Sequence, residues 1–202
     1  MKLNHLPTPF VLLISFTLIA LTALPAQAAS AAGGKNLPSL EKFAGSVNTK
    51  QAGVVTGVYA PGVLALKVAQ QPANDPAYVS TRAGSATQFQ AAAANGVTGL
   101  LAHNYLAGAE FLNLAEGQEV WLIYGDGALK RYRVTRLSRF QALEPKNPYS
   151  PLVDLATGAK ASATQVFSQV YTGGGQVVFQ TCISKDGDSS WGRLFVVATP
   201  VK

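Results

Sequence analysis

Short apolar runs separated by turn-forming residues fill the chain from Gly53 onward. Val54–Tyr59, Leu64–Val68 and Val97–Ala102 are three of these runs, and each is followed by polar or turn-forming residues. The sequence contains no internal repeat, no heptad pattern and no sustained long helix. Short strands at regular spacing, with turn signals between them, are typical of a barrel or a sandwich. The sequence therefore predicts an all-β fold.

The clearest hairpin in the sequence joins Glu119–Tyr124 to Ala128–Thr135 through the turn Gly125-Asp126-Gly127. Glycine in such a short turn allows the left-handed backbone conformations that tight hairpins need. Apolar and basic residues alternate in the second strand. One face of this strand is therefore expected in the core and the other in solvent.

Helical signals are few. The alanine-rich stretch Thr87–Ala94, which ends at Asn95-Gly96, predicts one short helix. A second helical stretch, Ala163–Tyr171, lies in the segment Glu144–Tyr171, which also contains three prolines. Tyr78–Thr81 is a weaker candidate strand. The sequence thus predicts one or two short helices beside the strands.

The N-terminus has the features of an export signal. Lys2 supplies a thin positive region, Phe10–Leu24 an apolar stretch, and Ala26-Gln27-Ala28 a small-x-small cleavage pattern. The apolar stretch spans 15 positions, fewer than the roughly 20 that a membrane span requires. We therefore expect residues 1–28 to be a cleaved signal peptide. Its retention as a membrane anchor is the alternative, and either outcome places the protein outside the cytoplasm, secreted or attached to the envelope.

Two further parts follow the expected signal. Residues 29–52 are mostly small and polar, which predicts a flexible tether with a short helix around Leu40–Phe43. Residues 53–202 predict one folded domain, because about 150 residues are enough for a single core.

The chain is mildly basic and rather apolar. Its formal charge is +6, and charged residues make up only 13% of it. This composition excludes a polycation of the nucleic-acid-binding type. Five basic residues nevertheless cluster within ten positions: Lys130, Arg131, Arg133, Arg136 and Arg139. They form either a solvated strand face or a patch that contacts anionic envelope polymer or lipid headgroups.

The single cysteine of the chain constrains its chemistry. An exported chain with one cysteine cannot form an internal disulfide, so the thiol is buried and inert, paired between chains, or a functional free thiol. Cys182 ends the β-type run Val177–Cys182, and Arg193 precedes the run Leu194–Thr199. Antiparallel pairing of these runs places Cys182 and Arg193 side by side at one rim of a sheet. A neighbouring guanidinium favours the thiolate over the thiol.

His103 follows the run Val97–Ala102 and is the one histidine of the expected mature chain. A thiolate is a nucleophile in acyl transfer, and a histidine can relay the proton to and from the leaving group. A cationic donor at the developing oxyanion typically lowers the barrier by about 3 kcal/mol. Each residue also has an ordinary explanation, as a core cysteine, a structural histidine and a solvated edge arginine.

Two motifs around these residues match a known family. Phe179-Gln180-Thr181-Cys182 is followed eleven positions later by Arg193 in the string WGRLFVVA, and Leu100–Asn104 carries a histidine at a strand end. In these motifs, and over roughly Val54–Pro200, the chain resembles the sortases, which are cysteine transpeptidases that cut surface proteins at a sorting motif and join them to an amine. The first two positions of the family's Thr-Leu-x-Thr-Cys motif are changed here, and alanine replaces the glycine that commonly precedes the histidine. The class of sortase is therefore not assigned.

The resemblance implies a closed eight-stranded β-barrel with a groove that ends at Cys182. It implies that Cys182 attacks the scissile carbonyl and forms a thioacyl intermediate. His103 would protonate the departing amine and deprotonate the incoming one, and Arg193 would hold the substrate backbone or the oxyanion. The segment Glu144–Tyr171 occupies the place of the family's substrate-recognition loop.

Thr181 and Asn104, which neighbour the cysteine and the histidine in sequence, are expected to contact the substrate. The implied partners are an exported protein or peptide with a sorting motif and an amine acceptor, with no nucleic acid. No cofactor or metal is predicted. Asp126, Asp186 and Asp188 stand beside glycine in turns, so the calcium that some sortases bind has no acidic cluster assigned to it.

Three alternatives stay open at this stage. A cysteine peptidase would hydrolyse the same intermediate with water. An L,D-transpeptidase of peptidoglycan also uses Cys, His and Arg, but its usual Ser-x-Gly-Cys setting is absent. A non-catalytic barrel that binds the envelope is the third.

Overall fold

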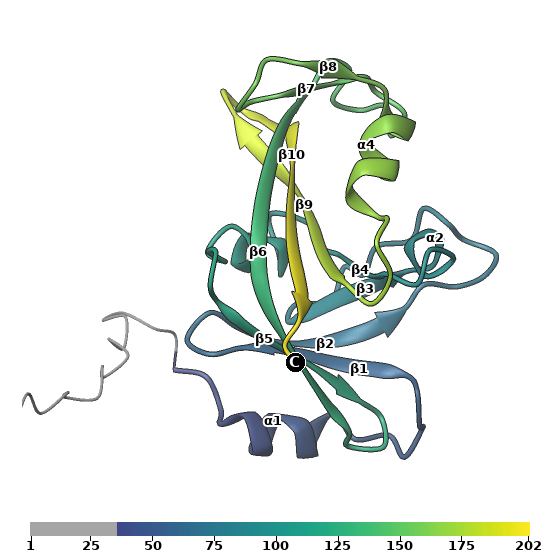
Figure 1. Cartoon of the computed structure of the whole chain (residues 1–202), viewed down its shortest axis with the longest axis vertical. Coiled ribbons are helices and arrows are strands. Elements are labelled where there is room, and N and C mark those ends of the chain that lie inside the picture. Colours follow the sequence, from purple (N-terminus) through teal and green to yellow (C-terminus); the bar gives the residue numbers. More distant parts are fainter. Residues whose placement is uncertain (1–35) are drawn as a thin grey trace, which may run out of the picture. The chain divides into compact units, whose positions relative to one another are not determined.

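Eight strands close into a barrel in the computed structural model, which describes residues 36–202. Around the ring the order is β10, β9, β4, β3, β2, β1, β5 and β6, and β6 pairs again with β10 to close it (Figure 1). The strands are β1 Val55–Ala60, β2 Leu64–Gln70, β3 Ser85–Phe89, β4 Thr98–Leu101, β5 Glu119–Tyr124, β6 Leu129–Ala142, β9 Val177–Lys185 and β10 Asp188–Pro200. The closed eight-stranded barrel that the resemblance implied is confirmed.

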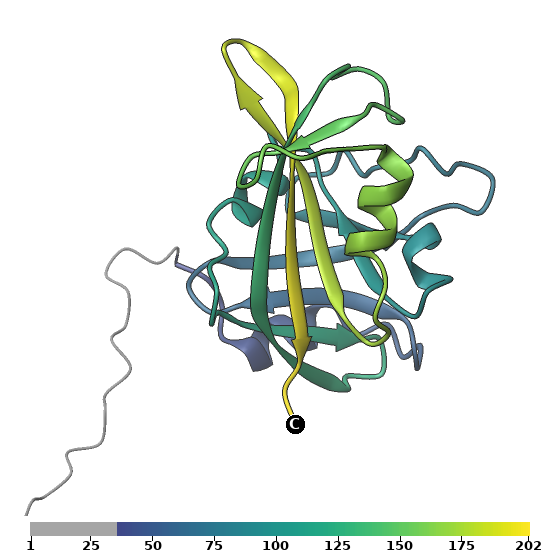
Figure 2. The same ribbon diagram turned by 45° about the horizontal axis from the view of Figure 1, so that its top comes forward.

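Six short elements complete the described part of the chain. Strands β7 Leu152–Asp154 and β8 Lys160–Ala161 extend the sheet beyond β6, and the helices are α1 Leu40–Ser46, α2 Gln90–Ala93, α3 Gly108–Phe111 and α4 Ala163–Val170. Residues 36–202 thus contain four short helices, where the sequence predicted one or two. Figure 2 shows the β7–β8 segment and the tip of the β9–β10 hairpin at the same end of the barrel.

The barrel interior holds the larger of the apolar clusters. Strands contribute alternate residues to it, as the two-residue period of a strand requires, and in β9 these are Val177 and Phe179. Phe179 packs edge-to-face against Phe111 of α3, with ring centroids 5.0 Å apart. The buried ring of Phe111 thereby anchors the segment between β4 and β5 to the barrel.

A second apolar cluster lies on the other face of β9 and β10. Val178, Phe195 and Val197 point away from the barrel interior and pack with Val166 and Val170 of α4. Figure 1 shows α4 alongside β9. The helix begins with a capping box in which the side chains of Ser162 and Gln165 each accept a backbone N–H from the other residue. Both faces of β9 are therefore covered along part of its length.

The helix expected over Thr87–Ala94 is only partly present. Residues up to Phe89 belong to β3, and the helix α2 begins at Gln90. Thr87 is fully buried, pairs with Leu101 of β4, and its hydroxyl accepts a 2.7 Å hydrogen bond from the backbone N–H of Ser80. Pairing with β4 therefore keeps residues 87–89 in a strand, and only the alanines that follow are helical. The weak candidate strand Tyr78–Thr81 is not a strand.

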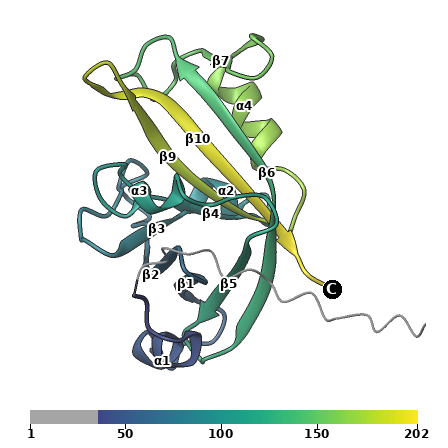
Figure 3. The same cartoon turned by 90° about the vertical axis from the view of Figure 1, so that its left-hand side faces the viewer.

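Helix α1 packs against the barrel through strands β1 and β5 (Figure 3). Phe43 and Val47 are buried with Tyr59 and Ile123, and the Tyr59 hydroxyl donates a 3.0 Å hydrogen bond to the Pro38 carbonyl. The helix expected around Leu40–Phe43 is thus present, and its buried side chains pack on β1 and β5. The domain boundaries stay predictions. Residues 29–35 of that predicted tether and the expected signal at 1–28 lie outside the described residues.

Within residues 36–202, no helix has the length and apolarity needed to cross a bilayer. Export and envelope attachment stay predictions.

The basic residues of β6 lie partly on its solvent face. Arg131 and Arg133 are exposed and lie 3.4 and 3.9 Å from a carboxylate oxygen of Glu119. Arg131 also lies over the Trp121 ring, 5.8 Å from its centroid. These contacts are those of a solvated strand face, and contact with an anionic envelope surface stays a prediction.

Phe43→Ala is expected to lower the free energy of unfolding by about 3 kcal/mol, because truncation of a buried aromatic side chain leaves a cavity. Urea unfolding of the variant measures this loss. Lys42→Ala, an exposed neighbour in the same helix, is the matched control and is expected to stay within about 0.5 kcal/mol of the unmodified protein. Equal stability of the two variants would show that α1 does not contribute to the fold.

Alkaline pH is expected to destabilise the barrel through Tyr132. Burial, together with the neighbouring Tyr124, raises the pKa of Tyr132 to about 12. The unfolded chain loses this proton near pH 10, whereas the folded chain keeps it, so the free energy of unfolding falls as the pH rises from about 10 to about 12.

Tyr132→Phe removes this phenol and is expected to make the alkaline fall shallower. Urea unfolding at about pH 9 and about pH 11 tests this, with Tyr149→Phe, whose side chain is 82% exposed, as control. An identical fall in Tyr132→Phe and in the unmodified protein would contradict the prediction.

Candidate active site

Cys182 and Arg193 are direct partners in the antiparallel ladder of β9 and β10. Paired residues in such a ladder project to the same face of the sheet. Gln180 and Phe195 form the next pair along that face. Cys182 is a free and partly exposed cysteine. The structure thus contains the pairing that the sequence predicts, and the catalytic roles of the two residues stay predictions.

His103 follows β4, which runs parallel to β9 with Leu101 opposite Gln180. The Ala102 N–H donates to the Gln180 carbonyl at 3.2 Å, which extends this ladder by one residue. Continuing the same register by one more residue aligns His103 with Cys182. Because Ala102 is buried in the barrel interior, strand alternation assigns His103 to the outer face, the face of Cys182. By this register we infer that His103, in the segment after β4, forms a row with Cys182 of β9 and Arg193 of β10.

The backbone after His103 turns tightly. The His103 carbonyl accepts hydrogen bonds of 2.9 Å from the N–H groups of both Leu106 and Gly108. The His103 ring stacks on Tyr105, with centroids 5.1 Å apart and planes inclined by 20°. Both the main chain and the ring of His103 are thereby held in place.

Thr181 lies on the opposite face of β9 from Cys182. It is buried, and its hydroxyl donates a 2.9 Å hydrogen bond to the Ala102 carbonyl. This bond fixes the residue that precedes His103. The placement favours a positioning role for Thr181 over the predicted contact with substrate.

Asn104 connects the loop after β4 to the β9–β10 hairpin. Its side-chain nitrogen donates to the Ser184 hydroxyl at 2.7 Å and to the Ser189 carbonyl at 2.8 Å. Both amide hydrogens are thus used within the protein. A contact between Asn104 and substrate stays a prediction, and only its amide oxygen could make it.

The Arg193 guanidinium binds three backbone carbonyls. Its Nη1 donates to Ser190 at 2.7 Å and to Gly192 at 2.9 Å, and its Nη2 donates to Pro145 at 3.0 Å. None of the acidic residues in the described part of the chain forms an ion pair with it. Two of its five N–H donors stay available, and its charge is not neutralised by a carboxylate.

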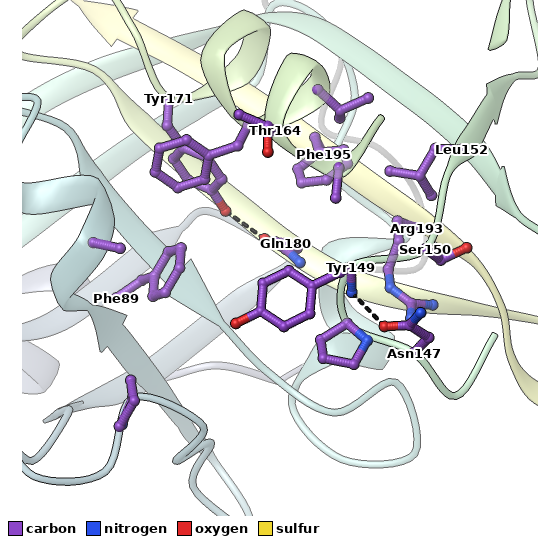
Figure 4. A pocket seen from close by; sticks show the side chains of 16 residues that line it. Phe89, Asn147, Tyr149, Ser150, Leu152, Thr164, Tyr171, Gln180, Arg193 and Phe195 are labelled. Carbon is purple, nitrogen blue, oxygen red and sulfur yellow. Dashed lines mark hydrogen bonds between the residues drawn. The ribbon is translucent and has the colours of Figure 1, made fainter. Parts of the chain in front are cut away.

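An apolar groove of about 490 Å³ reaches this row of residues (Figure 4). One wall comes from the segment 144–171, through residues that include Tyr149, Leu152, Phe167 and Tyr171. Gln180 and Arg193 line the groove as well. Because both are direct neighbours of Cys182 on the outer face, the groove ends beside the thiol. The segment that the resemblance assigned to substrate recognition is therefore part of the groove wall.

Two residues of this groove were not predicted from the sequence. The buried Tyr171 hydroxyl donates a 2.5 Å hydrogen bond to Oε1 of Gln180. Burial also raises the pKa of Tyr171 far above its ordinary value, so the hydroxyl stays a donor. The signal for Gln180 was its spacing: a polar residue two positions before Cys182 shares the face of the thiol.

No group of three or more His, Cys, Asp or Glu side chains that could hold a metal ion occurs in residues 36–202. Asp126 and Asp188 accept backbone N–H bonds from the second residue after each, at 3.0 and 2.8 Å. Such bonds are typical of turns. The absence of a cofactor stays a prediction.

No family model and no curated protein matches the chain. Several solved structures do, and sortases of types A, C, D and E are among them. Sortase A of Listeria monocytogenes is 15% identical, with a TM-score of 0.46, and the match covers 74% of this chain and 88% of that one. Sortase C1 of Streptococcus suis is 14% identical, with a TM-score of 0.49 and 73% of each chain covered.

Sortase E1 of Streptomyces coelicolor, whose structure holds a tripeptide in the active site, is 16% identical, with a TM-score of 0.46. That match covers 77% of this chain and 91% of the other. At such identities the likeness concerns the fold alone. The chemistry of this chain is derived from its own residues.

Gly108→Ala is expected to lower the free energy of unfolding by about 1–3 kcal/mol, because the position has no room for a methyl group. A Cβ there would lie 2.7 Å from the carbonyl oxygens of Ala102 and His103 and would also meet the Thr181 hydroxyl. The loop that carries His103 must shift to accept it. Urea unfolding measures the loss.

Gly45→Ala in α1 is the matched control, because nothing lies within 4 Å of a Cβ at that position. In a helix this exchange is expected to stabilise by about 0.5–1 kcal/mol. A Gly108→Ala variant as stable as the unmodified protein would contradict the close packing around His103.

Proposed function

We propose that the chain is a sortase-like cysteine transpeptidase that acts outside the cytoplasm. It cleaves a sorting motif in exported proteins or peptides and transfers the acyl part to an amine. One observation carries this proposal: Cys182 pairs with Arg193 in the β9–β10 ladder, beside the end of β4 that leads into His103, and an apolar groove reaches Arg193.

Cys182 is the nucleophile. Its thiolate attacks the carbonyl carbon of the scissile peptide bond, and a bond from Sγ to that carbon forms. The bond from the carbon to the amide nitrogen then breaks, and His103 protonates the departing amine. The product of this half-reaction is a thioacyl enzyme.

Arg193 stabilises the charge that develops during both half-reactions. Its guanidinium lies opposite Cys182 in the ladder. Its remaining N–H donors serve the tetrahedral oxyanion or the substrate backbone. The carbonyls of Ser190, Gly192 and Pro145 hold the guanidinium in a fixed position, so little reorganisation is needed at the moment of reaction.

The groove holds the acyl part of the substrate. The acyl part stays bound as the thioacyl enzyme, whereas the amine product must leave before the acceptor amine can bind. The apolar wall from segment 144–171 and the volume of the groove, about 490 Å³, suit part of an extended peptide. In the second half-reaction His103 accepts a proton from the incoming amine, which attacks the thioester and releases Cys182. Attack by water instead would make the protein a peptidase.

Intact-protein mass spectrometry tests the proposal. The protein is incubated with a library of sorting-type peptides, with or without glycinamide as acceptor. We expect a peptide-sized adduct on Cys182 that glycinamide discharges and that is absent from Cys182→Ala. His103→Gln is expected to slow adduct formation by about 10²–10⁴-fold, and Arg193→Met by about 10²–10³-fold.

Arg139→Met, an exposed arginine of β6, is the matched control for Arg193→Met and should react at the unmodified rate. Circular dichroism verifies that each variant is folded. Discharge by water alone, with no glycinamide product, would indicate a peptidase. The absence of any adduct from folded, reduced protein across the library would favour the non-catalytic envelope-binding barrel.

A further inference from the structure

We propose that Gln180 is a specificity-determining residue, which donates a hydrogen bond from its side-chain amide to an uncharged carbonyl oxygen of the substrate. Tyr171 is its positioning residue, because the buried hydroxyl fixes the orientation of the amide. This inference rests on the proposed function and names a contact by which the groove would recognise an extended peptide.

Gln180 occupies the position that such a contact requires. It lies on the same face of β9 as Cys182, two residues away, and lines the groove. Two residues of an extended strand span about 7 Å. An extended substrate whose scissile carbonyl lies at Cys182 therefore brings the second residue along its chain to Gln180.

The hydrogen bond from Tyr171 determines which atom of the amide faces the groove. The Tyr171 side chain is fully buried, and its hydroxyl has only Oε1 of Gln180 as an acceptor among the described residues. A flipped amide would present Nε2 to the phenol and leave the buried O–H without an acceptor, which is costly. The pair therefore holds Oε1 toward Tyr171 and leaves Nε2 as the free end (Figure 4).

The free end of this amide is an unused donor. Nε2 of Gln180 makes no hydrogen bond to any residue between 36 and 202. Most of the groove around it is apolar or aromatic, and Arg193 is the one charged residue among those that line it. A donor in such a wall discriminates between a substrate that offers a carbonyl oxygen and one that leaves the amide unpaired.

Alkylation of Cys182 by two reagents with the same reactive group tests the proposal. The peptidic reagent is N-acetyl-Leu-Ala-Ala chloromethyl ketone, and the simple reagent is chloroacetone. In both cases a bond from Sγ to the methylene carbon forms, and chloride leaves. The ratio of the two second-order rate constants isolates recognition of the peptide from the reactivity of the thiol.

In Gln180→Leu we expect the rate constant for the peptidic reagent to fall about tenfold. The variant lacks the proposed hydrogen bond, which leaves the carbonyl oxygen of the reagent unpaired. The rate constant for chloroacetone should not change. Tyr171→Phe keeps the amide but removes its orienting donor, so a smaller selective loss is expected. Gln169→Leu, an exposed glutamine of α4 outside the groove, is the matched control and should behave as the unmodified protein.

Four outcomes would overturn the inference. Unchanged rate constants for both reagents in Gln180→Leu would mean that Gln180 does not recognise the peptide, while the proposed transpeptidase chemistry would stand. An equal loss with both reagents would mean that Gln180 acts on the thiol. An unmodified protein that reacts no faster with the peptide than with chloroacetone would have no peptide site, and one that reacts with neither would lack the nucleophile on which the proposed function depends.

Discussion

The register of β9 against its two neighbours is the constraint on which the site depends. This strand pairs in parallel with β4 and antiparallel with β10. The second ladder places Arg193 opposite Cys182, and the first places Leu101, two residues before His103, opposite Gln180. A slip of one residue would turn Cys182 into the barrel and its neighbours out of it. The buried side chains of Phe179 and Thr181 oppose such a slip, because it would move both of them from the barrel interior to the partly polar outer face. Packing inside the barrel thus specifies the chemistry outside it.

The site lies where the covering of that outer face stops. Helix α4 buries Val178 and Val197 against the sheet, and further along the strands the same face becomes the groove and then the partly exposed thiol. Burial on this face of β9 decreases from Val178 in the core, through Gln180 in the groove, to the partly exposed thiol of Cys182. A single run of nine residues, Val177–Lys185, therefore belongs to the core at one end and to the candidate site at the other.

The pairing of Cys182 with Arg193 could be predicted because two β-type runs close in sequence pair antiparallel, which makes their register a local property. The contact of β4 with β9 joins residues about 80 positions apart, and only the family resemblance indicated it. The Thr87–Ala94 prediction was wrong at its first three residues for a related reason, since burial of Thr87 against β4 outweighs local propensity. Gln180 was missed because its partner, Tyr171, ends a helix whose packing the sequence pattern does not reveal.

The hydrogen bond from Arg193 to the Pro145 carbonyl connects the candidate active site to the segment that forms one wall of the groove. Insertions or deletions near Pro145 that changed the substrate preference would also move the carbonyl that binds the Arg193 guanidinium. A laboratory graft that imports a foreign recognition segment meets the same coupling. A replacement segment must therefore keep a main-chain carbonyl at position 145 that can accept this hydrogen bond. Sequence changes that alter substrate preference are better tolerated further along the segment, toward α4.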